Sequence, residues 1–383
     1  MRISHHLAAA ALAGAFVLSG CDAAGPATGV DVAPAQNGDV IADQYIVVLK
    51  GAPGEGSRAA VGRMISEVGA EDAVVFENVL PGFAARLDAQ ELAALQADDR
   101  VKYIEPDRVM VLKRPDRGSG GGGSGPAQVV PYGITRVNGG VASNGRACVI
   151  DSGVDLDHPD LNVDRNASRT FITSGRDARS ADDRNGHGTH VAGTIGALDN
   201  STGVIGVAAG ATIVGVKVLD ASGSGAYSAV IAGVDYVGSG APNCAVANMS
   251  LGGPVSQALD DAVLAAAANG VIFALAAGNE SDDARNHSPA RAGGVSANDN
   301  VYSISAVNSS DVFASFSNYG PAVAYAAPGV AINSTWMGGG YSTISGTSMA
   351  SPHAAGVFLL GAARTSGSAI GDPDGNPDPI IVR

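Results

Sequence analysis

The chain has 383 residues, with 37 acidic and 23 basic side chains and a formal net charge of −14. This negative charge argues against nucleic acid or an anionic membrane surface as the main partner. An apolar fraction of 45% together with 53 glycines is typical of a packed globular protein with many tight turns. The length is sufficient for a short leader, a small accessory domain and one catalytic domain.

Residues 1–21 have the pattern of an export signal. An apolar run over residues 7–18 follows Arg2 and is too short to span a bilayer. The run ends in the letters LSGC, which resemble a bacterial lipobox in which Cys21 carries the lipid. The alternative is an ordinary cleaved leader in which Cys21 has no role. Both interpretations predict an extracytoplasmic protein, and the first adds a lipid anchor on the precursor.

A small α+β domain is expected over residues 42–112, after a spacer over residues 22–41. Its apolar segments predict strands at 44–50, 73–79, 82–87 and 101–105, and helices at 57–68 and from Asp88, where Glu91 stands at capping-box spacing. The order β-α-β-β-α-β is that of a ferredoxin-like domain. Residues 113–126 are rich in Gly and Ser, which predicts a flexible linker and a domain boundary.

Residues 127–383 alternate short apolar segments with helical segments rich in Gly and Ala. Strands are expected at 147–150, 213–218, 244–249 and 271–275, and helices at 191–198, 226–237, 259–268 and 348–363. Apolar strands separated by helices predict an α/β domain with a mostly parallel sheet flanked by helices.

Four segments of this domain carry the groups that amide cleavage requires: a nucleophile, a base, a group that orients the base, and donors for the oxyanion. Asp151 ends a predicted strand, at the edge where parallel sheets place their sites. His187 lies within NGHGTHVAGT at a helix start, and Asn279 follows another strand within AAGNE. Ser348, within GTSMASPH, also begins a helix, where the dipole and the backbone N–H groups favour a developing negative charge.

These segments resemble the subtilase family, and ASFSNYG at 314–320 is similar to its proteinase K-like branch. The resemblance covers residues 127–363 and implies a triad of Asp151, His187 and Ser348, in the order known for subtilisin. It also implies an oxyanion site formed by Asn279 and the Ser348 N–H. The implied activity is that of an exported serine endopeptidase with broad specificity, which favours apolar or aromatic residues before the cut and uses no organic cofactor.

The resemblance further implies a groove in which two segments hold an extended peptide by strand addition. The residues concerned are Gly223, Ser224 and Gly225 in one segment and Ser250, Leu251 and Gly252 in the other. His287 is expected near the floor of the pocket for the residue before the cut.

A structural calcium site is implied by the same resemblance, with a plain loop as the alternative. Its expected ligands are side-chain or carbonyl oxygens, which suit a hard cation, from Gln128, Asp160, Leu198, Asn200, Thr202 and Val204. Cys148 and Cys244 fall near the ends of strands that are neighbours in the family fold. A disulfide and two buried free thiols both remain open.

Residues 42–112 resemble the inhibitor-like propeptide of subtilases, which templates folding, inhibits the enzyme and is then removed. Its tail is expected to begin near Asp107, and the cut to fall between residues 110 and 126. The expected protein is thus a self-processed precursor and a monomer. Its partners are its own propeptide and protein or peptide substrates, and nucleic acid is not among them.

Two other functions fit the sequence less well. A non-catalytic lipoprotein that binds proteases would not need all four catalytic residues. An esterase of the α/β-hydrolase kind requires Gly-x-Ser-x-Gly, whereas residues 346–350 are GTSMA and the acid and histidine precede the serine.

Overall fold

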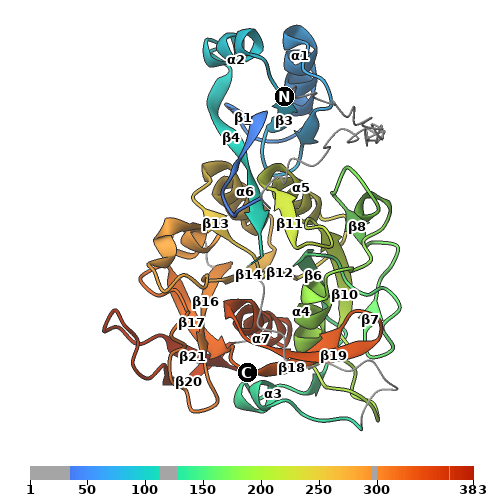
Figure 1. Cartoon of the computed structure of the whole chain (residues 1–383), viewed down its shortest axis with the longest axis vertical. Coiled ribbons are helices and arrows are strands. Elements are labelled where there is room, and N and C mark those ends of the chain that lie inside the picture. The colour runs from blue at the N-terminus through green and yellow to red at the C-terminus, as the bar shows by residue number, and fades with distance from the viewer. Residues whose placement is uncertain (1–34, 113–126, 295–299, 362) are drawn as a thin grey trace, which may run out of the picture. The chain divides into compact units, whose positions relative to one another are not determined.

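The computed structural model describes residues 35–112, 127–294, 300–361 and 363–383, which belong to one compact unit from Ala35 to Arg383 (Figure 1). The predicted leader with Cys21, most of the spacer and the predicted linker lie outside the described residues. Two sheets organise the described part: an antiparallel sheet near its beginning and a larger, mostly parallel sheet after it.

The N-terminal region has the predicted order of strands and helices. It consists of β1 (Val40–Leu49), α1 (Glu55–Val68), β2 (Val74–Phe76), β3 (Gly82–Arg86), α2 (Ala89–Gln96) and β4 (Val101–Val111). The strands lie in the order β4-β1-β3-β2 with antiparallel neighbours, which confirms the ferredoxin-like arrangement. The capping box is also confirmed: Asp88 accepts from the Glu91 N–H, and the Glu91 carboxylate accepts from the Asp88 N–H.

Residues 46–49 of strand β1 are buried on both faces, which explains their uninterrupted apolar sequence. Val47 and Leu49 pack in one cluster with α1 and α2. Ile46 and Val48 point to the opposite side and pack in a second cluster with α5 (Tyr227–Gly238). The small sheet is therefore a layer between its own helices and a helix of the second region.

Strand β4 extends further than the sequence predicts. The expected strand ends at Glu105, but β4 continues through Pro106 to Val111. Its outer edge meets β11 (Ser224–Ala226) only from Val109 onward, so Pro106 lies where an edge strand tolerates proline. The predicted boundary was wrong because Pro106 and Arg108 still pair with β1, and the last residues of β4 then pair with β11 of the second region.

A ten-stranded sheet forms the centre of the second region. Its strands, in spatial order, are β20 (Arg364–Ser368), β21 (Pro379–Val382), β17 (Val323–Pro328), β16 (Val301–Val307), β14 (Ile272–Ala276), β12 (Val246–Met249), β6 (Arg146–Asp151), β10 (Thr212–Lys217) and β7 (Asn162–Val163), with β8 (Arg169–Thr170) also beside β10. Neighbours are parallel except for β20 and β21. The predicted mostly parallel sheet is confirmed.

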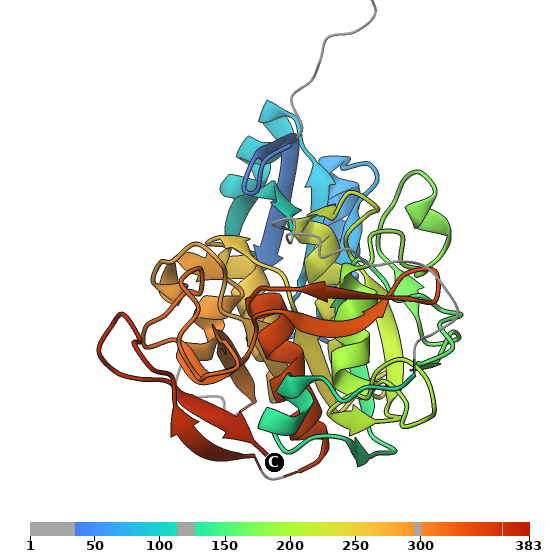
Figure 2. The ribbon, with the colours of Figure 1, turned by 60° about the horizontal axis from the view of Figure 1, so that its bottom comes forward.

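Helices cover both faces of this sheet (Figures 1 and 2). Cys148 and Ile150 of β6 pack with α5 and α6 (Gln257–Ala268) on one side. Ala147 and Val149 pack with α4 (His187–Gly196) and α7 (Thr347–Leu359) on the other. Because alternate residues of a strand point to opposite faces, residues 147–150 of β6 all have to be apolar.

The remaining described elements are short. One is the helix α3 (Tyr132–Arg136). Three strand pairs follow: β5 (Val141–Ala142) with β9 (Ala208–Ala209), β13 (Gly253–Pro254) with β15 (His287–Ser288), and β18 (Ile332–Trp336) with β19 (Gly340–Ile344). The 3-10 helices are η1 (Asp177–Arg179), η2 (Ala284–Asn286) and η3 (Ala290–Gly294). None of the helices in the described residues combines the length and apolar character that a membrane crossing requires.

A disulfide joins Cys148 to Cys244, with Cα atoms 5.7 Å apart. It connects β6 with the segment that leads into its neighbour β12, and both cysteines are buried. Of the two possibilities that the sequence left open, the structure therefore has the bridge.

Replacing both cysteines with alanine should lower the free energy of unfolding by about 2–5 kcal/mol, because the bridge closes a chain segment 96 residues long and restricts the unfolded state. Thermal unfolding with and without reductant measures the effect. Reductant should lower the midpoint of the wild type and leave the double variant unchanged. Equal midpoints in the wild type with and without reductant would contradict this prediction.

Candidate active site

Asp151 and His187 form a buried pair at the carboxyl edge of the large sheet. Asp151 is the last residue of β6, and His187 is the first residue of α4. His187 Nδ1 lies 2.8 Å from Asp151 Oδ1 and 3.0 Å from Oδ2. This close approach needs a glycine after the histidine, because a Cβ on Gly188 would lie 2.0 Å from the carbonyl oxygen of Gly153. The motif glycine therefore serves the contact between α4 and β6.

The charge of Asp151 sets the protonation of His187. Burial by itself would lower the pKa of His187, but the adjacent carboxylate and its hydrogen bond outweigh burial, so the pKa is raised above the ordinary 6.5. His190, one turn later, has no such carboxylate. Burial lowers its pKa to about 3, and its Nε2 lies 3.0 Å from the Ile332 carbonyl oxygen. His190 is thus a neutral packing residue, whereas Asp151 favours the protonated form of His187.

Ser348 lies in the first turn of α7, which packs alongside α4. Figures 1 and 2 both show these two helices next to each other. The Ser348 hydroxyl donates to the Ser250 carbonyl oxygen at 3.1 Å, and the Ser250 hydroxyl donates to the Ser348 carbonyl oxygen at 2.7 Å. The hydroxyl proton of Ser348 is therefore directed at a carbonyl, and its transfer to His187 requires the hydroxyl to rotate.

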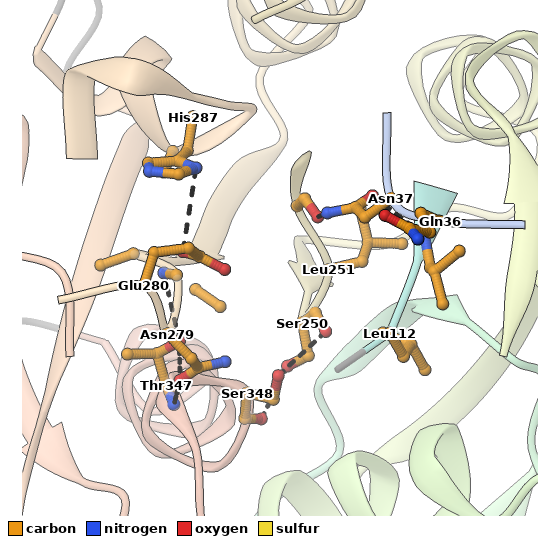
Figure 3. Close-up of a pocket in the computed structure, with 16 residues that line it drawn as sticks. Gln36, Asn37, Leu112, Ser250, Leu251, Asn279, Glu280, His287, Thr347 and Ser348 are labelled. Carbon is orange, nitrogen blue, oxygen red and sulfur yellow. Dashed lines mark hydrogen bonds and ion pairs between the residues drawn. The ribbon is translucent and has the colours of Figure 1, made fainter. Parts of the chain in front are cut away.

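Asn279 follows β14 and lines the same pocket as Ser348 (Figure 3). Its Oδ1 accepts from the Thr347 N–H at 2.8 Å and from the Thr347 hydroxyl at 3.0 Å. These two bonds fix the orientation of the carboxamide and turn its Nδ2 end away from Thr347. The sequence analysis missed Thr347, although its place in the Gly-Thr-Ser motif was a signal for it.

A cavity of about 430 Å³ lies beside Ser348. The sequence analysis expected Ser250, Leu251, Gly252 and His287 here, and all four line it. It did not expect several other lining residues, among them Gln36, Asn37, Val111, Leu112, Glu280 and Ala290. In Figure 3, Gln36, Asn37 and Leu112 face Asn279 and Thr347 across the pocket.

The end of β4 pairs with the segment over residues 223–225, which was expected to hold substrate. Val111 pairs with Ser224 and Met110 with Gly225 in an antiparallel ladder, and the Leu112 N–H donates to the Gly223 carbonyl oxygen at 2.9 Å. This edge of β11 therefore accepts an added strand, as an extended peptide would provide it.

Asn37 connects the end of β4 to the other expected groove segment. Its Oδ1 accepts from the Val111 N–H, and its Nδ2 donates to the Gly252 carbonyl oxygen, both at 3.1 Å. No local signal in the sequence pointed to this contact, because it joins residues separated by 215 positions.

Carboxylates hold the N-terminal region against the second region. The Glu105 carboxylate accepts from the Ser256 hydroxyl and from the Gln257 N–H at the start of α6. Asp107 accepts from the Ser228 N–H at 3.2 Å, at the start of α5. Burial raises the pKa of both acids, and the hydrogen bonds at the helix starts oppose that rise.

Asp235 of α5 provides a carboxylate from the second region that binds the N-terminal region. Its Oδ1 accepts from three consecutive backbone N–H groups of the loop after β2, those of Glu77, Asn78 and Val79. The docking contact is thus reciprocal, with a carboxylate from each region bound to backbone donors of the other.

The expected calcium ligands converge in one place. Asp160 Oδ1 lies 2.7 Å from Asn200 Nδ2, and Gln128 Nε2 lies 3.0 Å from the Leu198 carbonyl oxygen and 3.5 Å from that of Val204. The Thr202 N–H donates to Asn200 Oδ1.

This donor set consists of one carboxylate, two carboxamides and main-chain carbonyls, which is the chemistry a calcium ion prefers. With the Gln128 amide turned over, its oxygen would face the same two carbonyls. The Asn200 amide turned over in the same way would present its oxygen beside Asp160 in place of Nδ2, and with both amides so placed the residues fit a calcium ion. Within the described residues, no group of three or more His, Cys, Asp and Glu could hold a metal.

Comparison with known proteins agrees with this geometry. The model of the subtilase family matches residues 145–365, and that of the peptidase inhibitor I9 family matches residues 44–113. The chain belongs to the subtilase family. It is a serine peptidase that carries an inhibitor I9 region ahead of its peptidase region.

Several subtilases are similar over most of the chain. Proteinase R of Parengyodontium album is 38% identical over 86% of this chain and 82% of its own length. Subtilisin E of Bacillus subtilis is 41% identical over 83% of this chain and 79% of its own length. Alkaline serine exoprotease A of Vibrio alginolyticus is 42% identical over 84% of this chain. The matched part covers 60% of that relative's length. The crystal structure of a cold-adapted subtilisin-like serine proteinase matches with a TM-score of 0.57 at 40% identity, over 65% of this chain and 96% of its own.

An Asp151→Asn variant should lose turnover by about 10⁴-fold, the loss found when a serine protease triad loses this charge. Because Asp151 raises the pKa of His187, the acid limb in the profile of kcat/KM against pH should lie, in the wild type, above the ordinary pKa of an imidazole. In the variant burial dominates, and the limb should move to lower pH. The measurement is kcat/KM for a chromogenic peptide from pH 5 to 9, with the exposed Asp157→Asn as control. An acid limb at the same pH in wild type and Asp151→Asn would contradict the assignment.

Proposed function

We propose that the chain is the precursor of an exported serine endopeptidase that cleaves peptide bonds through an acyl-enzyme. The observation that carries the proposal is the buried Asp151–His187 pair, combined with a pocket that Ser348 and Asn279 line and that an extended strand enters. Membership of the subtilase family gives the reaction class.

In the proposed reaction, Ser348 Oγ attacks the scissile carbonyl after its hydroxyl rotates away from Ser250. Because Asp151 engages Nδ1 of His187, Nε2 is the nitrogen that takes the serine proton and later delivers it to the leaving amine. Asp151 keeps this tautomer and stabilises the imidazolium that forms. Water then releases the acyl group by the same proton path.

The oxyanion is proposed to bind to Asn279 Nδ2 and the Ser348 N–H. Thr347 holds the other end of the Asn279 carboxamide, so the amide does not have to reorient when charge develops. Ser348 stands in the first turn of α7, where the helix dipole also favours negative charge.

Protein and peptide substrates are proposed to bind as an added strand between residues 223–225 and residues 250–252. The ladder formed by β4 supports this mode, because it uses the same edge of β11. The walls formed by Leu251, Ala276 and Ala290 fit the apolar or aromatic side chains that the family resemblance implies.

Residues 42–112 are proposed to act as the chaperone and inhibitor of residues 127–383, with residues 113–126 as the linker that is cleaved. Occupation of β11 by β4 blocks the substrate edge until the cut is made. Residues 1–21 would export the precursor, and a lipid on Cys21 would hold it at the membrane through the spacer over residues 22–41. Maturation would then release a monomeric enzyme from the cell envelope.

A calcium ion is proposed to be held by Gln128, Asp160 and Asn200 together with the carbonyl oxygens of Leu198, Thr202 and Val204. The bound ion would connect the start of the peptidase region to the loop over residues 198–204 and compensate the charge of buried Asp160. The proposed role is structural.

Self-processing tests the proposed function directly. The wild-type precursor should lose its N-terminal region over time, whereas Ser348→Ala should stay intact by mass spectrometry, because the nucleophile is missing. A trace of matured wild-type enzyme should cut the variant to a stable fragment of the mature mass, whereas an unfolded variant would be degraded further. Ser366→Ala, an exposed serine on β20, is the matched control. Processing of Ser348→Ala at the wild-type rate would overturn the assignment.

Removal of calcium should lower the thermal midpoint of the matured enzyme, because a ligand at 100 times its Kd contributes about 2.7 kcal/mol. Unfolding followed by circular dichroism, in calcium and in a chelator, measures the shift. Asp160→Asn should unfold at the same temperature in both solutions. Identical midpoints for the wild type in calcium and chelator would exclude the site.

A further inference from the structure

Asp183 is a buried carboxylate that the proposed reaction does not use. It lies in the loop that leads into α4, four residues before His187, and is only 5% exposed. Its backbone pairs with the segment that follows β6, because the Asp183 N–H donates to the Val154 carbonyl oxygen at 3.2 Å. The Asp183 side chain is therefore placed between the two elements that carry Asp151 and His187.

Five donors surround the two carboxylate oxygens of Asp183. Its Oδ1 accepts from the Ser152 hydroxyl at 3.0 Å and from the N–H groups of Asn185 and Gly186 at 2.9 and 3.0 Å. Its Oδ2 accepts from the Thr189 N–H at 3.0 Å and from the Thr189 hydroxyl at 2.6 Å. Burial raises the pKa of Asp183, and the hydrogen bonds, that of Gly186 foremost, oppose this rise. A proton on either oxygen would displace one of the donors, so the arrangement favours the carboxylate.

The Ser152 hydroxyl connects Asp183 with the backbone beside both members of the catalytic pair. Ser152 is the residue after Asp151, and its Oγ accepts from the N–H of Gly188, the residue after His187, at 3.0 Å. Because Oγ accepts there, the single hydroxyl proton is directed at Asp183. The path from Asp183 through Ser152 to Gly188 therefore fixes the separation of the two backbone segments that carry the pair.

A second connection runs through Thr189 in the first turn of α4. Its hydroxyl donates to Asp183 and accepts from the Asp155 N–H at 2.9 Å. Ser152 and Thr189 are both fully buried, so water does not compete for these hydrogen bonds. Asp183 thus holds the start of α4 and the loop after β6 together at two points.

The charge of Asp183 acts on His187 in the same sense as the charge of Asp151. It adds to the rise in the pKa of His187, as a smaller contribution than that of Asp151. The nearby buried cation, Lys217 of β10, donates to the Ser152 carbonyl oxygen at 2.5 Å and lies 3.2 Å from Asp177 Oδ1. The charge of Lys217 is therefore compensated by Asp177.

The other elements packed around His187 bring no further buried charge. Burial lowers the pKa of His190 in α4 to about 3 and that of His353 in α7 to about 4, so both are neutral. The hairpin β18–β19, which packs on α4, contains no charged residue. Arg184 is exposed, and Asp155, Asp157 and Asp182 line a surface hollow together with Asp183.

We propose that Asp183 is a positioning residue of the active site, which holds His187 against Asp151 through Ser152 and Thr189. The proposal rests on the proposed peptidase reaction and adds to it a residue that touches neither the substrate nor the reacting atoms. The five donors make the carboxylate itself necessary, because an amide in its place would turn an N–H group toward other donors.

The first experiment compares the matured wild type with Asp183→Asn, using a chromogenic peptide from pH 5 to 9. The variant should lower kcat by about 10- to 100-fold and leave KM unchanged, because the catalytic pair is displaced while the substrate contacts remain. The acid limb of kcat/KM against pH should move to lower pH, because the charge that supports the imidazolium is lost. The matched control is Asp182→Asn, which removes the adjacent half-buried charge and should leave kcat and the acid limb as in the wild type.

The second experiment separates the hydroxyl path from the charge. Ser152→Ala keeps every charge and removes the path, so it should lower kcat and leave the acid limb in place. Because both substitutions act through the same path, the double variant of Asp183→Asn with Ser152→Ala should lower kcat by less than the product of the two single effects. Precursors that mature slowly are processed by immobilised wild-type enzyme, and circular dichroism verifies that each variant is folded.

The outcomes separate the two levels of the argument. If neither the wild type nor Asp182→Asn cleaves the peptide, the proposed peptidase function itself fails. If both cleave it, a wild-type kcat in Asp183→Asn, or an unmoved acid limb with fully multiplicative effects in the double variant, would overturn the positioning role. If Asp183→Asn does not fold, Ser152→Ala decides, and a wild-type kcat in that variant would overturn the proposed path.

Discussion

The parallel pairing of β6, β12 and β14 is the constraint on which the proposed site depends. These strands are hydrogen-bonded neighbours and run in one direction, so their carboxyl ends meet at one edge. Asp151 ends the first, Ser250 follows the second and Asn279 follows the third. Helices α4 and α7 return to the same edge with His187 and Ser348 in their first turns. The catalytic candidates are therefore placed by the sheet and not by flexible loops.

Two-sided burial holds this sheet in position. Alternate residues of β6 enter two separate clusters, one with α5 and α6 and the other with α4 and α7. A polar substitution at residues 147–150 would meet a packed helix, which is why this stretch of β6 is apolar without interruption. The Cys148–Cys244 bridge ties β6 to its neighbour on the α5 side. The edge that carries the chemistry thus has a rigid support.

In the proposed function, the N-terminal region inhibits by pairing with a strand beside the pocket. Strand β4 belongs to two sheets: it pairs with β1 within its own region and with β11 at the pocket. Its acids Glu105 and Asp107 bind donors at the starts of α6 and α5, and Asp235 binds backbone N–H groups in return. In the proposed function, inhibition and substrate binding would therefore use one interaction, strand addition at β11.

The sequence by itself determined the ferredoxin-like order of elements, the mostly parallel sheet and the candidate catalytic residues Asp151, His187, Asn279 and Ser348, because strand periodicity, capping spacing and motif order are local properties. The tertiary structure decided the extension of β4 through Pro106, the disulfide, the hold of Thr347 on Asn279, and the arrival of Asn37 at Gly252. Each of these joins segments far apart in the chain or depends on how two regions dock. No local pattern encodes such a contact, because its partner is supplied only when the whole chain has folded.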